Sequence, residues 1–264
     1  MTSSCFSRFA ELADFSLTPK ADLATLSLLH QRWPALIPFE NIETLLGRPV
    51  SLDVAQIAEK LLDRKRGGYC FEHNLLFRQI LEEIGFVVTT HLARVVWGRA
   101  KPDATPQTHM LLTLSVDGVR YLADVGFGGV SLTAPLRLEE GERHGHRLER
   151  LSNEEWLLSV NSGGEWRLMY RFADRACEQA DILVASHFVA THQDSLFRHS
   201  LMMAKIINGR QNNLFNRRLT VYGAEKREQE AGSYEAFRAF ILSFFIEENV
   251  LNEMEIRAVY EKIR

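Results

Sequence analysis

The sequence has few cysteines and no long hydrophobic run. Three cysteines in 264 residues (Cys5, Cys70 and Cys177) are odd in number and widely spaced. They do not form a disulfide framework, and a chain of this length can bury a core without one. The longest apolar stretch, 240–246, is far too short to span a bilayer, and residues 1–15 lack the apolar run of a signal peptide. We therefore expect a protein of the reducing cytoplasm, not of the membrane, with free thiols.

Excess positive charge is also absent. The chain carries 31 Lys and Arg residues against 34 Asp and Glu residues, for a net charge of -3. Nothing in this balance would hold the phosphates of a nucleic acid or of an acidic membrane. The hydrophobic share of 46% and the charged share of 25% are ordinary for a soluble globular protein. We therefore expect no nucleic-acid partner and no membrane partner.

Helical patterning dominates residues 1–86. Thr18 and Pro19 are expected to open one helix, which Pro34 ends. A second helix begins near residues 51–53. A third begins at Cys70 and stops at Gly85, which suits a left-handed helix end.

Strand patterning follows in residues 87 to about 172 and predicts an antiparallel barrel or curled sheet. Residues 191–264 are mixed, with a strand pair over 201–223 and helices over 233–245 and 253–264. The segment 140–156 has no motif, and His144 and His146 are expected to be exposed. No linker separates the three regions. The chain is thus predicted to be α+β, with three parts packed as one body.

The stretch RGGYCFEHN (66–74) places Cys70 where a helix begins. Unpaired N–H groups and the helix dipole stabilise a thiolate there, and the two preceding glycines allow close approach of the backbone. A small buried hydrophobe is the common alternative for a helical cysteine. His73 gives a Cys-x-x-His spacing, but no second pair of ligands completes a zinc site, so we expect no metal.

A predicted β-hairpin brings a histidine and a carboxylate together. Asp117-Gly118 is a strong two-residue turn, so facing residues have numbers that sum to 235, as 117 and 118 do. This register makes one face of the hairpin fully apolar. Because burial of such a face specifies the pairing, it supports this register over the others. On the other face Asp124 is a diagonal neighbour of His109, about 7–8 Å away at the backbone and within hydrogen-bond reach. Taken singly, each could be an ordinary strand or turn residue. Together with Cys70 they form a nucleophile–base–orienter set.

These stretches resemble the arylamine N-acetyltransferase family. The motifs, in order, are IPFENIETLLGRPV (37–50), RGGYCFEHN, THMLLTL (108–114), DVGFGG (124–129) and SLFRHSLMMAKIINGR with NRRLTV (195–221). The resemblance implies a helical bundle over 1–86, a β-barrel over 87–190 and an α/β lid over 191–264. It also implies a core like that of transglutaminases and cysteine proteases. The lid lacks the long insertion of eukaryotic members, which indicates a bacterial-type protein.

The resemblance also implies roles for residues. The catalytic triad falls on Cys70, His109 and Asp124, and Glu40 and Arg66 correspond to a buried ion pair that supports the cysteine loop. Residues at positions implied to contact the acceptor or coenzyme A are Phe39, Tyr69, Thr108, Gly126, Phe127, Gly128 and Gly129. The glycines among them allow a tight backbone path against a bulky ligand.

The implied activity is transfer of an acetyl group from acetyl-CoA, as co-substrate, through a cysteine thioester. Arylamines, arylhydrazines or N-hydroxyarylamines would be the acceptors, in a ping-pong order, and no tightly bound cofactor is expected. Two alternatives remain open. The same triad could serve a hydrolase or an amide synthase with another acyl donor, or the chain could bind CoA or a partner without catalysis.

Overall fold

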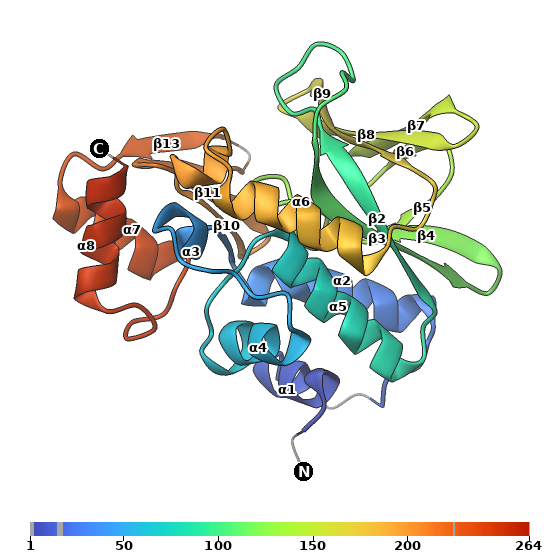
Figure 1. Ribbon diagram of the computed structural model, residues 1–264, viewed down its shortest axis with the longest axis horizontal. Coiled ribbons are helices and arrows are strands. Elements are labelled where there is room, and N and C mark those ends of the chain that lie inside the picture. Colours follow the sequence, from blue (N-terminus) through green and yellow to red (C-terminus); the bar gives the residue numbers. More distant parts are fainter. Residues whose placement is uncertain (1–2, 15–17, 224, 264) are drawn as a thin grey trace.

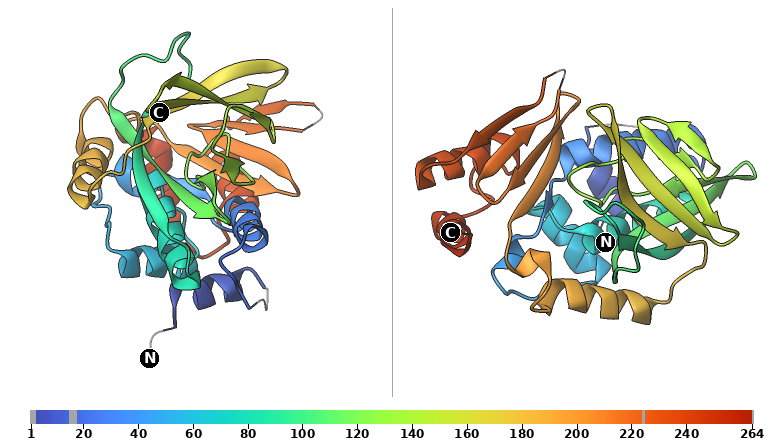
Figure 2. Two further views of the ribbon diagram at one scale, coloured as in Figure 1. Left: turned by 90° about the vertical axis from the view of Figure 1, so that its right-hand side faces the viewer. Right: turned by 90° about the horizontal axis from the view of Figure 1, so that it is seen from above.

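The computed structural model describes residues 3–14, 18–223 and 225–263, in which helices pack against two antiparallel sheets (Figures 1 and 2). The helices are α1 (Cys5–Leu12), α2 (Leu23–Leu36), α3 (Ile42–Leu45), α4 (Val54–Ala58), α5 (Cys70–Ile84), α6 (Gln179–Thr191), α7 (Tyr234–Phe244) and α8 (Glu253–Lys262). A π-helical turn, Glu59–Asp63, continues α4, and a 3-10 turn, Leu196–Arg198, follows α6. Within these ranges no helix is long and apolar enough to cross a membrane.

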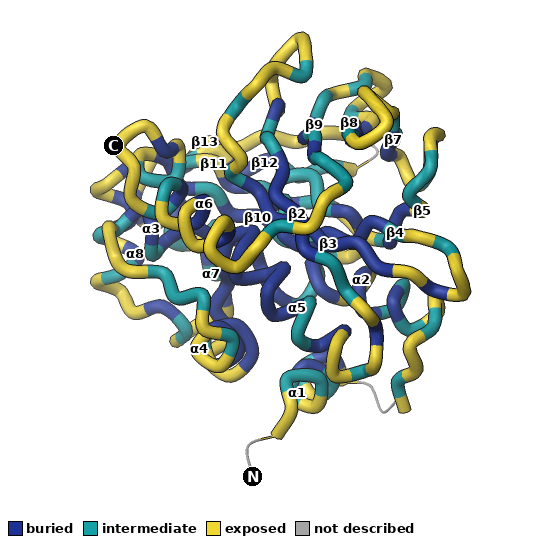
Figure 3. Tube along the Cα trace, turned by 45° about the vertical axis from the view of Figure 1, so that its right-hand side comes forward, coloured by how far each residue is buried: buried dark blue, intermediate teal, exposed yellow. Residues whose placement is uncertain are grey.

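Helix α5 is the centre of the N-terminal helices, and most of its residues are buried (Figure 3). It runs from Cys70 to a left-handed Gly85 at φ 108°, as the sequence predicts. The prediction for α2 is wrong at both ends. The helix starts after Asp22, whose carboxylate accepts from the Thr25 amide over 2.8 Å, and not at Thr18. Pro34 lies inside its last turn, where its missing N–H costs one hydrogen bond to the carbonyl of His30, and the helix continues only to Leu36.

The larger sheet is a nearly closed antiparallel barrel in the order β5-β4-β3-β2-β9-β8-β7-β6. Its strands are β2 (Val88–Val95), β3 (Gln107–Val116), β4 (Val119–Ala123), β5 (Leu136–Arg137), β6 (Gly141–Arg143), β7 (His146–Ser152), β8 (Glu155–Ser162) and β9 (Glu165–Ala173). The β3–β4 hairpin has the predicted register, from Val116–Val119 to Leu112–Ala123. Both turn residues have positive φ, 49° at Asp117 and 76° at Gly118, as this turn requires.

The second sheet has the order β1-β10-β11-β12-β13 and carries α7 and α8. Its strands are β1 (Phe39–Glu40), β10 (Met202–Ile207), β11 (Arg210–Phe215), β12 (Arg218–Val221) and β13 (Arg227–Glu230). The predicted strand pair over 201–223 is thus three strands, because Asn216 adopts a left-handed turn that splits the second segment. Strand β1 pairs with β10, so residues near position 40 join the C-terminal sheet.

One further expectation is wrong. The segment 140–156 forms the β6–β7 hairpin and the start of β8, and His146 is buried because its side chain shares the inward face of β7 with Leu148. Only His144, in the turn, is exposed. Helix α6 was not predicted, and it runs across position 190, the expected boundary between barrel and lid.

Candidate active site

Cys70 is the first residue of α5, and a tight loop holds it there. The carboxylate of Glu72 accepts from the Tyr69 amide over 3.0 Å, which caps the helix start. A Cβ at Gly67 would lie 2.2 Å from the Pro38 carbonyl oxygen, so only glycine fits this approach. The Cys70 side chain is buried and its sulfur lies 3.7 Å from the carbonyl oxygen of Thr108 on β3. The helix start and the barrel strand therefore meet at the thiol.

His109 and Asp124 lie together at the end of the β3–β4 hairpin. The Nε2 atom of His109 is 2.7 Å from Oδ2 of Asp124, and both residues are buried. The other oxygen of Asp124 accepts from the Asn74 amide at 3.0 Å and from the Gly126 backbone at 2.9 Å. The carboxylate is thus fixed from three directions, and it holds the imidazole.

Asn74 is a residue that our sequence reasoning missed. Besides the contact with Asp124, its side chain donates to the Met110 carbonyl at 2.7 Å and accepts from the Val125 amide at 3.2 Å. It therefore ties α5 to β3 and to the chain just after β4. Asn74 stands four residues after Cys70, one helical turn along the same face, and that spacing was a signal available in RGGYCFEHN.

The charges at this site favour an imidazolium. Burial by itself lowers the pKa of His109, but the charge and hydrogen bond of Asp124, with a hydrogen bond from Cys70, outweigh it and raise the pKa to about 10. Burial works to raise the pKa of Asp124, and the charge of His109 with the surrounding hydrogen bonds lowers it overall. Because Nε2 faces Asp124, Nδ1 is the ring atom left for Cys70. The three side chains can hold a thiolate, an imidazolium and a carboxylate in sequence.

Aromatic rings surround the imidazole. Phe127 meets it edge-on with ring centroids 5.2 Å apart, and Tyr170, another residue not foreseen, lies 4.9 Å away. The half-exposed Trp97 extends this group, 6.4 Å from Phe127. These rings limit the access of water to His109.

A second aromatic group adjoins the cysteine loop. Phe197, in the 3-10 turn after α6, lies 5.9 Å from Phe39 and 6.2 Å from Tyr69 between ring centroids. The hydroxyl of Tyr69 is 2.5 Å from that of Ser186 on α6. Phe39 and Tyr69 are both buried. The sequence did not single out Phe197. It reaches this group because the 3-10 turn after α6 lies against the cysteine loop.

The glycines of VGFGG pack against protein. A Cβ at Gly126 would lie 2.9 Å from the Cys70 Cα, and one at Gly128 would lie 3.1 Å from the Phe39 ring. At Gly129 the nearest atom is the amide nitrogen of Asn213, at 3.3 Å. Close packing of the strand end on α5 and β1 therefore already explains why Gly126 and Gly128 are glycines.

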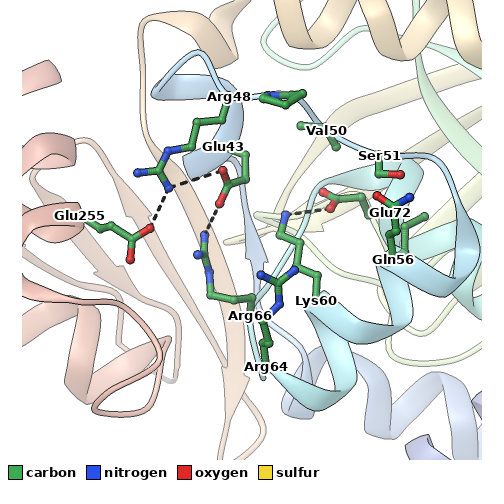
Figure 4. Close-up of a pocket in the computed structure, with 12 residues that line it drawn as sticks. Glu43, Arg48, Val50, Ser51, Gln56, Lys60, Arg64, Arg66, Glu72 and Glu255 are labelled. Atoms are coloured by element: carbon green, nitrogen blue, oxygen red, sulfur yellow. Dashed lines mark hydrogen bonds and ion pairs between the residues drawn. The ribbon is translucent and has the colours of Figure 1, made fainter.

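Arg66 forms the implied buried ion pair. It donates to Glu40 over 3.0 Å and to Glu43 over 3.1 Å, and its own side chain is 9% exposed. Figure 4 shows the surrounding network, in which Arg48 joins Glu43 to Glu255 of α8. The network borders a cavity of about 300 Å³. This cavity touches neither the sulfur of Cys70 nor His109, and its carboxylates already have cationic partners.

His73 binds protein groups through both ring nitrogens. Trp33 donates to its Nδ1 at 2.7 Å, so Nε2 carries the hydrogen and faces the carbonyl oxygens of Pro38 at 3.2 Å and Gly68 at 3.0 Å. His73 therefore joins the loop that precedes β1 to the loop that precedes Cys70. In the parts of the chain that the structure describes, no three His, Cys, Asp or Glu residues form a cluster suited to a metal ion.

Comparisons with known proteins agree with this geometry. A family model described as N-acetyltransferase matches residues 22–247. The arylamine N-acetyltransferase of Mycolicibacterium smegmatis is 38% identical over 250 residues, which cover 91% of each chain. A Salmonella typhimurium relative, named arylamine N-acetyltransferase / N-hydroxyarylamine O-acetyltransferase, is 41% identical over 187 residues, 69% of this chain and 65% of the relative.

Solved structures extend the likeness to the whole chain. The arylamine N-acetyltransferase of Mycobacterium marinum matches with a TM-score of 0.92 at 31% identity, covering 98% of this chain and 100% of that chain. The same enzyme in complex with CoA matches with a TM-score of 0.90 at 32% identity, covering 98% and 99%. The chain that carries Cys70, His109 and Asp124 in this arrangement belongs to the arylamine N-acetyltransferase family.

Proposed function

We propose that this protein transfers the acetyl group of acetyl-CoA to the nitrogen of an arylamine through a thioester on Cys70. The observation that carries the proposal is the buried contact of His109 with Asp124 beside the thiol at the start of α5. Membership of the family supports the donor and the acceptor class, as does the relative whose structure was solved with CoA. Arylhydrazines and N-hydroxyarylamines are acceptors of the same chemistry.

In the first half-reaction the Cys70 thiolate attacks the thioester carbonyl of acetyl-CoA. The C–S bond to CoA breaks, and the CoA sulfur leaves with the proton that His109 carried. The acetyl group is then a thioester on Cys70, and His109 is neutral.

In the second half-reaction the amine nitrogen attacks the acetyl carbon. His109 takes the proton from that nitrogen, the bond to Cys70 breaks, and the amide product leaves. The thiolate and the imidazolium are then restored. Asp124 keeps the ring oriented in both steps.

Glu40, Arg66 and Asn74 support the site without touching the substrate in this proposal. Phe39, Tyr69 and Phe127, with Thr108 and the loop of Gly126, Gly128 and Gly129, remain the proposed surroundings of the acceptor and of the CoA arm. The adjoining aromatic rings support a flat acceptor, because ring faces stack favourably. No tightly bound cofactor enters the reaction. We also propose the cytoplasm as its location, which its free thiols support.

Intact-protein mass spectrometry after mixing with acetyl-CoA tests the proposal. We expect one acetyl group on Cys70, located by peptide mapping and discharged by an arylamine. A Cys70→Ala variant should gain no acetyl group, whereas Cys177→Ala, which removes a half-buried thiol elsewhere, should be acetylated as the parent is. Discharge by water as fast as by the arylamine would favour a hydrolase. An unmodified parent would contradict the proposed function.

A further inference from the structure

Just beyond strand β4, three successive backbone amides are each bound by a side chain. The ladder with β3 ends at Ala123, so strand pairing no longer directs the chain at Asp124. The contacts are Asp124 N–H to His30 Nε2 at 3.1 Å, Val125 N–H to Asn74 Oδ1 at 3.2 Å, and Gly126 N–H to Asp124 Oδ1 at 2.9 Å. These contacts fix the backbone that presents the Asp124 carboxylate to His109.

His30 is the member of this set that comes from another part of the fold. It lies on α2, is fully buried, and meets the Phe77 ring edge-on at 5.8 Å between centroids. Because Nε2 accepts a hydrogen bond, the ring hydrogen is on Nδ1, and among the described residues no other residue offers Nδ1 a partner. A buried N–H without such a partner is unfavourable. A phenylalanine could fill the place without this cost, so the acceptor atom is what the histidine adds.

The surroundings keep His30 neutral and able to accept. Burial lowers the pKa of His30 to about 4, more than the nearby charge of Asp124 raises it. His146, whose pKa burial also lowers, acts in the same direction on His30. At neutral pH the Nε2 lone pair therefore remains available to the Asp124 amide.

We propose that His30 is a positioning residue for Asp124, which holds the carboxylate in line with His109 by binding the amide of the same residue. The inference rests on the proposed function of the triad. Without the acceptor, the backbone at residue 124 can rotate, and the carboxylate rotates with it because both groups share one Cα. The 2.7 Å contact with His109 should then lengthen. His109 would become a weaker base.

The test compares two variants at position 30 with a matched histidine elsewhere. His30→Phe removes the acceptor, and His30→Gln keeps an oxygen that can accept. The control is His91→Phe, because His91 is equally buried but bonds to Thr113 at 2.8 Å, away from Asp124. The readouts are the NMR titration of the His109 ring, kcat and KM with acetyl-CoA and an arylamine, and Tm.

For His30→Phe we expect the His109 titration midpoint to fall by about one pH unit and kcat to fall about tenfold at nearly constant KM. His30→Gln should recover most of both. His91→Phe should lower Tm and move neither quantity. If the phenylalanine variant does not fold, His30→Met, which also fills irregular apolar space, replaces it.

An unchanged His109 midpoint in a folded variant without the acceptor would overturn the proposal, as would a glutamine variant no better than phenylalanine. An equal shift in the His91 control would overturn it too. The titration needs no substrate. A parent protein that transfers no acetyl group would therefore contradict the proposed function and still leave the role of His30 to be decided by the ring of His109.

Discussion

The Nε2 atom of His109 lies 2.7 Å from Oδ2 of Asp124, with side chains that are 3% and 0% exposed. A hydrogen bond between charged partners is strong where water is excluded, so the pair fixes the orientation of the ring. It also leaves Nδ1 as the ring nitrogen available to Cys70. The proposed order of the three groups along the proton path rests on this one contact.

Replacing Asp124 with asparagine should reduce kcat far more than it reduces stability. An amide can donate to Nε2 and so favour the tautomer with its hydrogen on Nδ1, which can no longer take a proton from the thiol. The comparable change in serine proteases costs about 10⁴ in kcat. For Asp124→Asn we expect a loss of at least about 10² in steady-state acetyl transfer, with the circular dichroism of the parent. Asp174→Asn, which removes a carboxylate paired with Arg120 at the barrel surface, is the control. Near-normal turnover in Asp124→Asn would contradict the role of the hairpin.

Alkylation should reveal the ion pair between Cys70 and His109. Asp124 and Cys70 hold the pKa of His109 at about 10 against the opposing effect of burial, so a positive ring stands beside the sulfur at neutral pH. We expect iodoacetamide to modify Cys70 faster in the parent at about pH 7 than in a His109→Gln variant, which removes the positive ring beside the sulfur. The two rates are measured by mass spectrometry. Equal rates would show that the ion pair is absent.

Arg66→Ala should lower the melting temperature as well as the activity. Arg66 pairs with Glu40 and Glu43 while almost fully buried, and loss of one partner leaves Glu40 buried without its main cation. Breaking such a pair costs about 3–5 kcal/mol. Arg64→Ala is the matched control, because Arg64 is 61% exposed and lies 3.6 Å from an exposed Glu59, a kind of pair worth about 0–1 kcal/mol. Equal melting temperatures for the two variants would mean that the buried pair does not support the loop.

The contacts of the site could be predicted where the two residues lie in one local motif, and not where they are far apart in the sequence. The alternation of β3 and β4 with an Asp-Gly turn fixed the neighbourhood of His109 and Asp124, because hairpin register is a local property. The start of α5 was equally local. Glu40, in the short strand β1, and Arg66, in the loop before α5, are 26 residues apart. No periodicity relates them, so only the family resemblance suggested their contact.

The missed features arise from tertiary packing. Helix α6 has apolar residues on all sides, with Leu183 and Val184 exposed and Ile182 buried, so it lacks the periodic stripe that predicts a surface helix. His30 meets Asp124 across 94 residues only because α2 packs against the end of the hairpin. His146 is buried because it shares the inward face of β7 with Leu148, and no recognisable motif in the segment 140–156 indicated a strand there.

Acid should destabilise the fold through its buried neutral histidines. Burial lowers the pKa of His73 to about 4 from 6.5, despite hydrogen bonds to Pro38 and Gly68 that act to raise it. A base with a lowered pKa in the folded state binds its proton first in the unfolded chain. Its contribution to stability is therefore complete above about pH 6.5 and is lost as the pH falls toward 4. Each such histidine contributes up to about 1.4 kcal/mol per pH unit in that window.

Urea unfolding of His73→Gln between pH 7 and 4 checks this. We expect a shallower fall of the unfolding free energy than in the parent, since His30 continues to titrate and the glutamine does not. His144→Gln, at an exposed turn, should keep the slope of the parent. A slope that His73→Gln leaves unchanged would mean that His73 accepts its proton without loss of the fold.

The order of substrates follows from the use of one sulfur. Cys70 has a single buried side chain beside Thr108 and His109, so it must receive the acetyl group before it can give it to the amine. If CoA and the arylamine approach the same face of that sulfur, CoA must leave before the amine enters, and the kinetics are ping-pong. Double-reciprocal plots at several arylamine concentrations should then be parallel, and free CoA should compete with the arylamine. Intersecting lines would mean that both substrates bind together, and direct attack on acetyl-CoA would replace the thioester on Cys70.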